Sequence, residues 1–175
     1  MRRVISSAAV LTLLATSVVS APRAHGSALT CDVTVPNGVV AGSPNRDENS
    51  YGTSALSVGP FGLWPNGTVV FKPGGPGFLT PDAALVMKFG WTRGVSGKLQ
   101  VAGRRLDGDA GPLRLSLNSG YGDVGFQASY LIFPTPGCWE VHAQLAERAD
   151  SGITFVTKVV KIGEGPSGRL NPHVE

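Results

Sequence analysis

After Asn66 the sequence alternates between apolar and polar residues with a period of two, in one short segment after another. This alternation is typical of strands that bury one face of a sheet. Turn-forming runs such as Pro65-Asn66-Gly67 and Pro134-Thr135-Pro136-Gly137 separate the segments. The predicted apolar faces consist of Val69 and Phe71; Leu85, Met87 and Phe89; Leu99 and Val101; Leu113, Leu115 and Leu117; Val124, Phe126, Ala128, Tyr130 and Ile132; and Trp139, Val141, Ala143 and Leu145, with a last strand from Ile153 to Ile162 that is apolar on both faces.

Composition supports the same fold class. Glycine (24) and proline (13) make up 37 of the 175 residues, and no long 3.6-residue apolar stripe predicts a helix after the N-terminal segment. The sequence therefore predicts an all-β protein, a single antiparallel β-sandwich of about seven to nine short strands. The predicted sandwich covers residues 29–162 with a long polar loop at Pro36 to Ala55, and residues 163–175 are expected to form a flexible tail.

The N-terminal segment has the layout of a secretory signal peptide. Arg2 and Arg3 precede an apolar stretch from Ser6 to Val19, and small residues follow it. Residues 1–28 are therefore predicted to be removed on export. No later segment reaches the roughly 20 apolar residues that a transmembrane helix needs, so the mature chain is expected to lack one. A secreted or cell-envelope-associated protein is predicted.

Two cysteines remain after this leader, Cys31 and Cys138. In an exported chain, such a pair predicts a disulfide, with two free thiols as the alternative. Cys138 shares a face of its predicted strand with Glu140 and His142, opposite Trp139, so the bond is expected at the edge or on the outside of the sandwich.

The charges exclude one class of partner. Without Arg2, Arg3 and Arg23 of the leader, 12 of the 15 Lys and Arg residues remain against 12 Asp and Glu residues. A neutral domain has no overall field to attract nucleic acid, so no nucleic-acid partner is predicted.

Catalytic and metal-binding sets are not apparent in the sequence. His142 is the single histidine inside the predicted domain, which leaves copper and zinc sites short of ligands. Asp107-Gly108-Asp109 lacks the further ligands of a calcium loop. We therefore predict no catalytic residue, no metal, no cofactor and no enzymatic activity. The alternative is a small hydrolase that uses Asp123 with a second carboxylate.

Aromatic and basic residues near turns form the candidate binding surface. Such side chains bind acidic or carbohydrate ligands through forked hydrogen bonds and stacking. Trp64 and Trp91 stand beside turns and are expected to be exposed, whereas Trp139 is expected in the core. A competing interpretation pairs Arg105 and Arg114 with Asp107 and Asp109. The candidate surface comprises Trp64, Trp91, Arg93, Arg104, Arg105, Tyr121 and Asp123.

Five segments from Leu63 onward form a distinctive set of motifs: Leu63-Trp64-Pro65-Asn66-Gly67-Thr68-Val69-Val70-Phe71, Pro73-Gly74-Gly75-Pro76-Gly77-Phe78, Gly103-Arg104-Arg105-Leu106-Asp107, Ser119-Gly120-Tyr121-Gly122-Asp123 and Phe133-Pro134-Thr135-Pro136-Gly137-Cys138-Trp139-Glu140-Val141. Together they resemble a family of small exported bacterial proteins of unknown function. The resemblance covers about a hundred residues, with Cys31 and Pro36-Asn37-Gly38, and it implies a bacterial source without assigning a catalytic residue. The Gly137-Cys138-Trp139-Glu140-Val141 segment is also similar to immunoglobulin-like domains, which supports the fold class alone.

These observations predict a non-catalytic binding or interaction module at the bacterial envelope, with a glycan, a peptide or a protein as its partner. Besides the hydrolase, a second alternative is a secreted enzyme inhibitor or immunity protein that presents the loop from Pro73 to Phe78.

Overall fold

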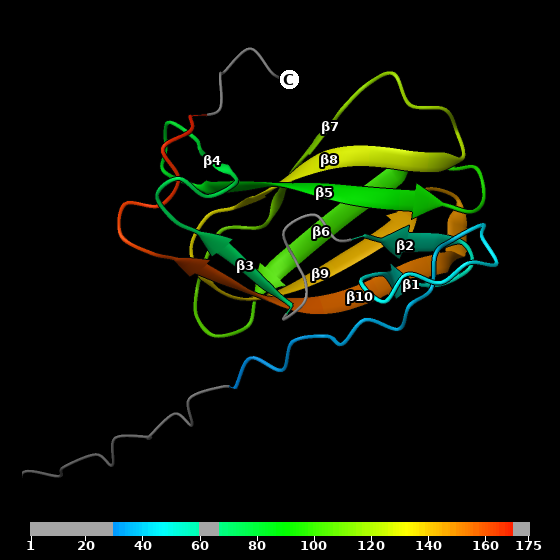
Figure 1. The fold of residues 1–175 in the computed structure, drawn as a ribbon, viewed down its shortest axis with the longest axis horizontal. Helices are drawn as coiled ribbons and strands as arrows, with labels where there is room; N and C mark the ends of the chain where they lie inside the picture. Colours follow the sequence, from blue (N-terminus) through cyan, green and yellow to red (C-terminus); the bar gives the residue numbers. More distant parts are fainter. Residues whose placement is uncertain (1–29, 60–66, 170–175) are drawn as a thin grey trace, which may run out of the picture.

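The computed structural model of the chain describes residues 30–59 and 67–169. The predicted signal peptide, Trp64 and the end of the predicted tail lie outside these residues. In the described part the secondary structure is all strand (Figure 1). The strands are β1 (Tyr51–Gly52), β2 (Leu56–Val58), β3 (Thr68–Phe71), β4 (Phe78–Leu79), β5 (Leu85–Arg93), β6 (Leu99–Arg105), β7 (Arg114–Leu117), β8 (Gly125–Phe133), β9 (Gly137–Leu145) and β10 (Arg148–Lys161).

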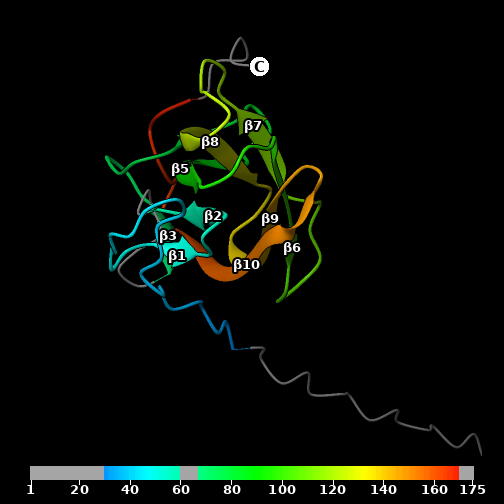
Figure 2. The same cartoon turned by 90° about the vertical axis from the view of Figure 1, so that its right-hand side faces the viewer.

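Two sheets pack face to face, which confirms the predicted all-β sandwich. One sheet has the order β1-β2-β5-β8-β7, with β4 also paired to β5, and the other has the order β3-β10-β9-β6. Figure 2 shows β5, β7 and β8 on one side of the molecule and β6, β9 and β10 on the other. All pairings are antiparallel except β3 with β10, which run parallel, so the second sheet is mixed.

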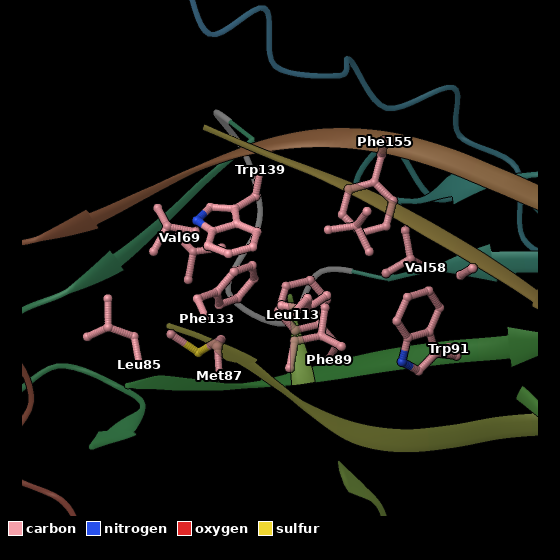
Figure 3. Packing of buried hydrophobic residues seen from close by; sticks show 14 of the residues in the cluster. Val58, Val69, Leu85, Met87, Phe89, Trp91, Leu113, Phe133, Trp139 and Phe155 are labelled. Carbon is pink, nitrogen blue, oxygen red and sulfur yellow. The ribbon is translucent and has the colours of Figure 1, made fainter. Parts of the chain in front are cut away.

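Aromatic side chains fill the space between the sheets (Figure 3). Phe89 of β5 lies 6.5 Å from Phe155 of β10, and Phe133 of β8 lies 5.6 Å from Trp139 of β9, between ring centroids. Trp91 continues the alternation of β5 and is fully buried. The expectation that Trp91 is exposed was therefore wrong, because β5 runs through Gly90 instead of ending there.

Both buried indoles have a hydrogen-bond partner inside the molecule. Trp91 Nε1 donates to Ser129 Oγ at 2.8 Å, and Trp139 Nε1 donates to the Thr135 carbonyl at 3.0 Å. A buried N–H without a partner would destabilise the fold, so these bonds fix how each ring enters the core.

The side of β8 that faces the core is not the side that the sequence predicted. Ser129, Leu131 and Phe133 point inward with Gln127, whereas Phe126 is 47% exposed on the outer side. The inner face includes polar residues because Ser129 accepts the Trp91 N–H. The outer side is apolar because Ile132 packs with Ala84 and Val86 in a second, smaller cluster.

The segment predicted as a loop, Pro36 to Ala55, includes β1, and the Asn37 side chain makes two of the hydrogen bonds that order it. Asn37 Nδ2 donates to the Gly52 carbonyl at 2.8 Å, and Asn37 Oδ1 accepts from the Gly52 N–H at 3.1 Å. This amide reproduces a strand-like pair of bonds across the loop, and Val39 forms an isolated bridge with Arg46. The seven strands expected from the alternation correspond to β3 and β5 to β10, and the three unexpected strands are only two or three residues long.

Residues 163–169, which the sequence placed in a flexible tail, pack against β4. The Leu79 N–H donates to the Gly168 carbonyl at 2.9 Å, and Leu79 forms a parallel bridge with Arg169. Figure 1 shows this segment turning from the end of β10 toward β4.

The predicted disulfide joins Cys31 to Cys138 across 107 residues. Cys138 lies opposite Lys158 and beside the inward-facing Trp139, so the bond is on the outer side of the β3-β10-β9-β6 sheet, as expected. Figure 1 shows the N-terminal segment running along β10 on this side. The Thr34 N–H donates to the Val156 carbonyl at 2.9 Å, and Thr34 Oγ1 accepts from the Val156 N–H at 2.8 Å. The disulfide therefore fastens the N-terminal segment to β9, beside the point where β3 begins to pair with β10.

Replacing both cysteines, Cys31→Ser with Cys138→Ser, should lower the free energy of unfolding by about 4 kcal/mol, since the bond closes a very long loop in the unfolded chain. Urea denaturation of the variant and of the native chain, followed by tryptophan fluorescence, measures this. The native chain with added reductant serves as the second comparison. Equal denaturation midpoints in all three samples would contradict a stabilising role for the bond.

Candidate functional site

The outer side of the β3-β10-β9-β6 sheet carries a row of polar side chains that β6, β9 and β10 bring together. Inward burial of the apolar residues of β9 turns Glu140, His142 and Gln144 outward. In the strand register, Gln100 lies opposite Gln144, Ala102 opposite His142 and Arg104 opposite Glu140, while Thr154 flanks His142 from β10. We call these residues the polar face: Gln100, Ala102, Arg104, Glu140, His142, Gln144 and Thr154.

Hydrogen bonds across the strands hold the side chains of the polar face in place. Arg104 Nε donates to Glu140 Oε1 at 2.8 Å, and Gln144 Nε2 donates to Gln100 Oε1 at 3.1 Å. His142 lies between these two pairs. Its Nδ1 is 3.0 Å from Thr154 Oγ1 and its Nε2 is 3.5 Å from Gln144 Oε1. His142 therefore contacts one side chain of β10 and one of its own strand.

An open hollow of ≈ 240 Å³ lies within the polar face, lined by Ala102, Gly103, Arg104, Glu140 and His142. The hollow exists because Ala102 is short, while the residues beside it on β6 and opposite it on β9 are long. On the other side of His142, a Cβ on Gly152 would lie 3.3 Å from the imidazole Cε1. Gly152 therefore leaves just enough room for the ring in its observed position.

Arg105 belongs to a corner of the fold, where two of the sequence motifs meet. Its Nε pairs with Asp107 Oδ1 at 2.7 Å, and its Nη1 donates to Thr135 Oγ1 at 3.4 Å. Desolvation raises the pKa of Asp107, but hydrogen bonds from Arg105 and from the Cys138 backbone, with the charge of Arg105, outweigh it and lower that pKa. The interpretation that Arg105 pairs with Asp107 is confirmed.

Arg114 pairs with Asp82 at 3.0 Å, so the predicted pairing of Arg114 with Asp107 or Asp109 was wrong. The turn before β5 brings Asp82 beside β7, a contact between distant segments that the local sequence does not indicate. A hydrogen bond from Thr80 and the neighbouring Arg114 lower the pKa of Asp82, against a smaller opposing effect of desolvation.

Arg93 is only 5% exposed and anchors two loops. Its Nη1 donates to the Gly97 carbonyl at 3.1 Å, and its Nη2 donates to the Gly122 carbonyl. Its Nε and the buried Gln127 Oε1 have no hydrogen-bond partner among the described residues. Arg93 therefore holds the loop between β7 and β8 through the Gly122 carbonyl.

Tyr121 and Asp123 lie on that loop and are exposed. The Tyr121 ring packs edge-on against Phe126, with centroids 5.8 Å apart. Arg93, the last residue of β5, binds Gly97 just before the start of β6, whereas Arg104 and Arg105 are at the other end of β6. The structure therefore divides the candidate surface into two clusters, and the polar face contains only Arg104 of the predicted residues.

The sequence predicted that His142 shares a strand face with Cys138 and Glu140, but the candidate surface did not include His142, Gln100, Gln144 or Thr154. The alternation of β9 contained a usable signal, since Glu140, His142 and Gln144 recur at every second position. Their partners on β6 and β10 depend on strand order and register, which alternation does not specify.

Comparisons with models of known protein families, with curated proteins and with solved structures found no match to this chain. Within residues 30–59 and 67–169, no three His, Cys, Asp or Glu side chains are grouped so that they could hold a metal ion. The same part of the chain contains no helix with the length and apolar character needed to cross a membrane. The disulfide is compatible with an extracellular protein.

Gly137→Ala should destabilise the Arg105 corner. A Cβ at Gly137 would meet Arg105 Nε and come within 2.7 Å of Asp107 Oδ1, and the φ of 148° also disfavours a side chain. We expect the free energy of unfolding to fall by about 1–3 kcal/mol, measured by urea denaturation. Gly111→Ala is the matched control, because its Cβ would have only Pro134 Cγ nearby, at 3.9 Å. Equal stability of the two variants would rule out this packing argument.

The Arg105–Asp107 pair should also make stability depend on pH. Folding lowers the pKa of Asp107 below its ordinary value of 3.8, so protons bind the unfolded chain more readily. The stabilisation is therefore present above pH ~4 and lost as the pH falls through the folded-state pKa. Asp107→Asn should reduce the free energy of unfolding at pH 7 by less than about 1 kcal/mol, since the pair is partly exposed, and by a smaller amount at pH ~3. A difference that stays constant over this pH range would contradict the assignment.

Proposed function

We propose that this chain is an exported, non-catalytic binding module of the bacterial cell envelope, and that the polar face binds a glycan. The observation that carries the proposal is a pair of hydrogen-bonded groups beside an open hollow: Arg104 with Glu140, and His142 with Thr154 and Gln144. These side chains are already positioned, so a ligand would lose less free energy in ordering them. The leader pattern, the disulfide and the resemblance to exported bacterial proteins support the compartment.

The chemistry of the polar face favours a glycan over a protein partner. Guanidinium, amide, carboxylate and imidazole groups offer both donors and acceptors, and sugar hydroxyls act as both. The central part of a protein–protein interface is typically enriched in aromatic residues and depleted in charges. The hollow instead has Arg104, Glu140 and His142 around Ala102.

Two alternatives have less support from the structure. An inhibitor that presents the loop from Pro73 to Phe78 would need an exposed Phe78, but this ring packs against Tyr130, with centroids 6.2 Å apart. A hydrolase built on Asp123 would place its chemistry on the loop between β7 and β8, away from the hollow of the polar face.

Isothermal titration calorimetry with soluble fragments of cell-wall glycan tests the proposal. We expect saturable binding, and we expect Arg104→Ala with His142→Ala to weaken it by about tenfold or more, because hydrogen bonds to charged groups are lost. Lys88→Ala, an exposed change on the outer side of β5, is the control and should leave both affinity and thermal stability unchanged. Mass spectrometry should show the glycan intact after incubation.

Three results would overturn the proposal. The first is the absence of saturable binding to any fragment. The second is full affinity in the doubly substituted variant, which would move the site elsewhere on the surface. The third is release of glycan products, which would make the protein an enzyme.

A further inference from the structure

A second and larger hollow, of ≈ 400 Å³, lies where the chain leaves β10. Its walls come from the turn after β3, from β4 and the turn that follows it, and from residues 161–169. We call it the Lys161–Arg169 hollow. Its volume falls within the roughly 300–1,000 Å³ that is typical of small-molecule sites.

Glycine contacts hold the outer wall of this hollow against the sandwich. Gly168 accepts a hydrogen bond from the Leu79 N–H at 2.9 Å, and a Cβ on Gly168 would lie only 2.8 Å from Phe78 Cδ1. The bridge between Leu79 and Arg169 continues this contact. The segment therefore packs closely on β4 and places Arg169 at the rim.

Lys161 is held at the opposite wall by its aliphatic stem. A Cβ on Gly165 would come within 3.1 Å of Lys161 Cε and 3.4 Å of its Cγ, so the stem lies directly over this glycine. Gly165 has a φ of 78°, which favours glycine at this position. A stem packed in this way has less rotamer freedom to lose when its ammonium binds a ligand.

Positive charge exceeds negative charge around the hollow. Lys161 and Arg169 line it with a single carboxylate, that of Glu164, and none of the three forms an ion pair with a described residue. The nearby Asp82 is paired with Arg114 instead. An ammonium and a guanidinium that form no ion pair within the described part of the chain favour an oxyanion, which a guanidinium binds with two parallel hydrogen bonds.

The backbone at Ala83, another wall residue, adds an independent observation. Ala83 has a φ of 63°, an unfavourable conformation for alanine that costs about 1–2 kcal/mol. Thr80 holds this turn, since its carbonyl accepts from the Ala83 N–H at 2.9 Å and its Oγ1 accepts from the Ala84 N–H at 2.8 Å. Strain of this kind is concentrated at binding and catalytic sites.

We propose that the Lys161–Arg169 hollow binds a small molecule that carries a carboxylate or a phosphate, with Lys161 and Arg169 as the groups that contact the oxyanion. The site is separate from the polar face and does not depend on the glycan proposal. Apolar wall residues such as Leu79 and Pro73 would contact the uncharged part of the ligand.

NMR titration of the ¹⁵N-labelled full chain at constant ionic strength tests this site. The probes are inorganic phosphate, galacturonate and, as the uncharged match of galacturonate, galactose. We expect saturable shifts in the amides of residues 163–165 and 167–169 with at least one oxyanion and none with galactose. A response to phosphate alone indicates a phosphorylated ligand, and a response to galacturonate indicates a carboxylate ligand.

Lys161→Gln with Arg169→Gln should weaken this binding by about tenfold or more, since charge-assisted hydrogen bonds are lost. The matched control is Lys88→Gln with Lys98→Gln, which removes the same charge from exposed positions outside the hollow and should leave the affinity unchanged. The proposal is overturned if neither phosphate nor galacturonate gives saturable shifts. It is also overturned if the two double variants bind with equal affinity. Binding that occurs only when the residues after Arg169 are removed would also overturn the proposal, because the C-terminal residues themselves would then occupy the hollow.

Discussion

The inward packing of aromatic rings between the two sheets is the constraint on which the other features depend. Trp139 of β9 meets Phe133 of β8, and Phe155 of β10 meets Phe89 of β5. Once Trp139 is inside, the period of two turns every second residue of β9 outward. Cys138 and His142 are on that outer side, so the disulfide and the polar face both follow from how β9 enters the core.

Strand positions were predictable where a single face is apolar, as in β9, and the two errors of facing have physical causes. Trp91 was expected to be exposed because Gly90 looked like a turn, yet β5 continues past it. In β8, the inner face contains Ser129, whose hydroxyl accepts the hydrogen bond from Trp91 Nε1. The outer face is apolar because Ile132 packs in a second hydrophobic cluster. A strand with apolar residues on both faces does not reveal by alternation which face is buried.

The candidate residues could be selected from the sequence one by one, but their partners could not. Arg105 and Asp107 are two residues apart, and their ion pair was foreseen. Arg114 forms its ion pair with Asp82 because β7 pairs with β8, which in turn pairs with β5. The packing of residues 163–169 against β4 was not predicted, because it depends on glycine contacts and one bridge. Such contacts leave no periodic signal in the sequence.

The parallel pairing of β3 with β10 departs from the predicted antiparallel sandwich, and it creates the second hollow. In a parallel pair both strands end at the same edge of the sheet, and here Phe71 lies opposite Lys161. The turn that begins with Pro73 and the segment that follows β10 must therefore leave the sheet side by side. An antiparallel neighbour would have directed one of them to the other end of the molecule. The charges of Lys161 and Arg169 thus face the turns around β4 as a consequence of strand direction.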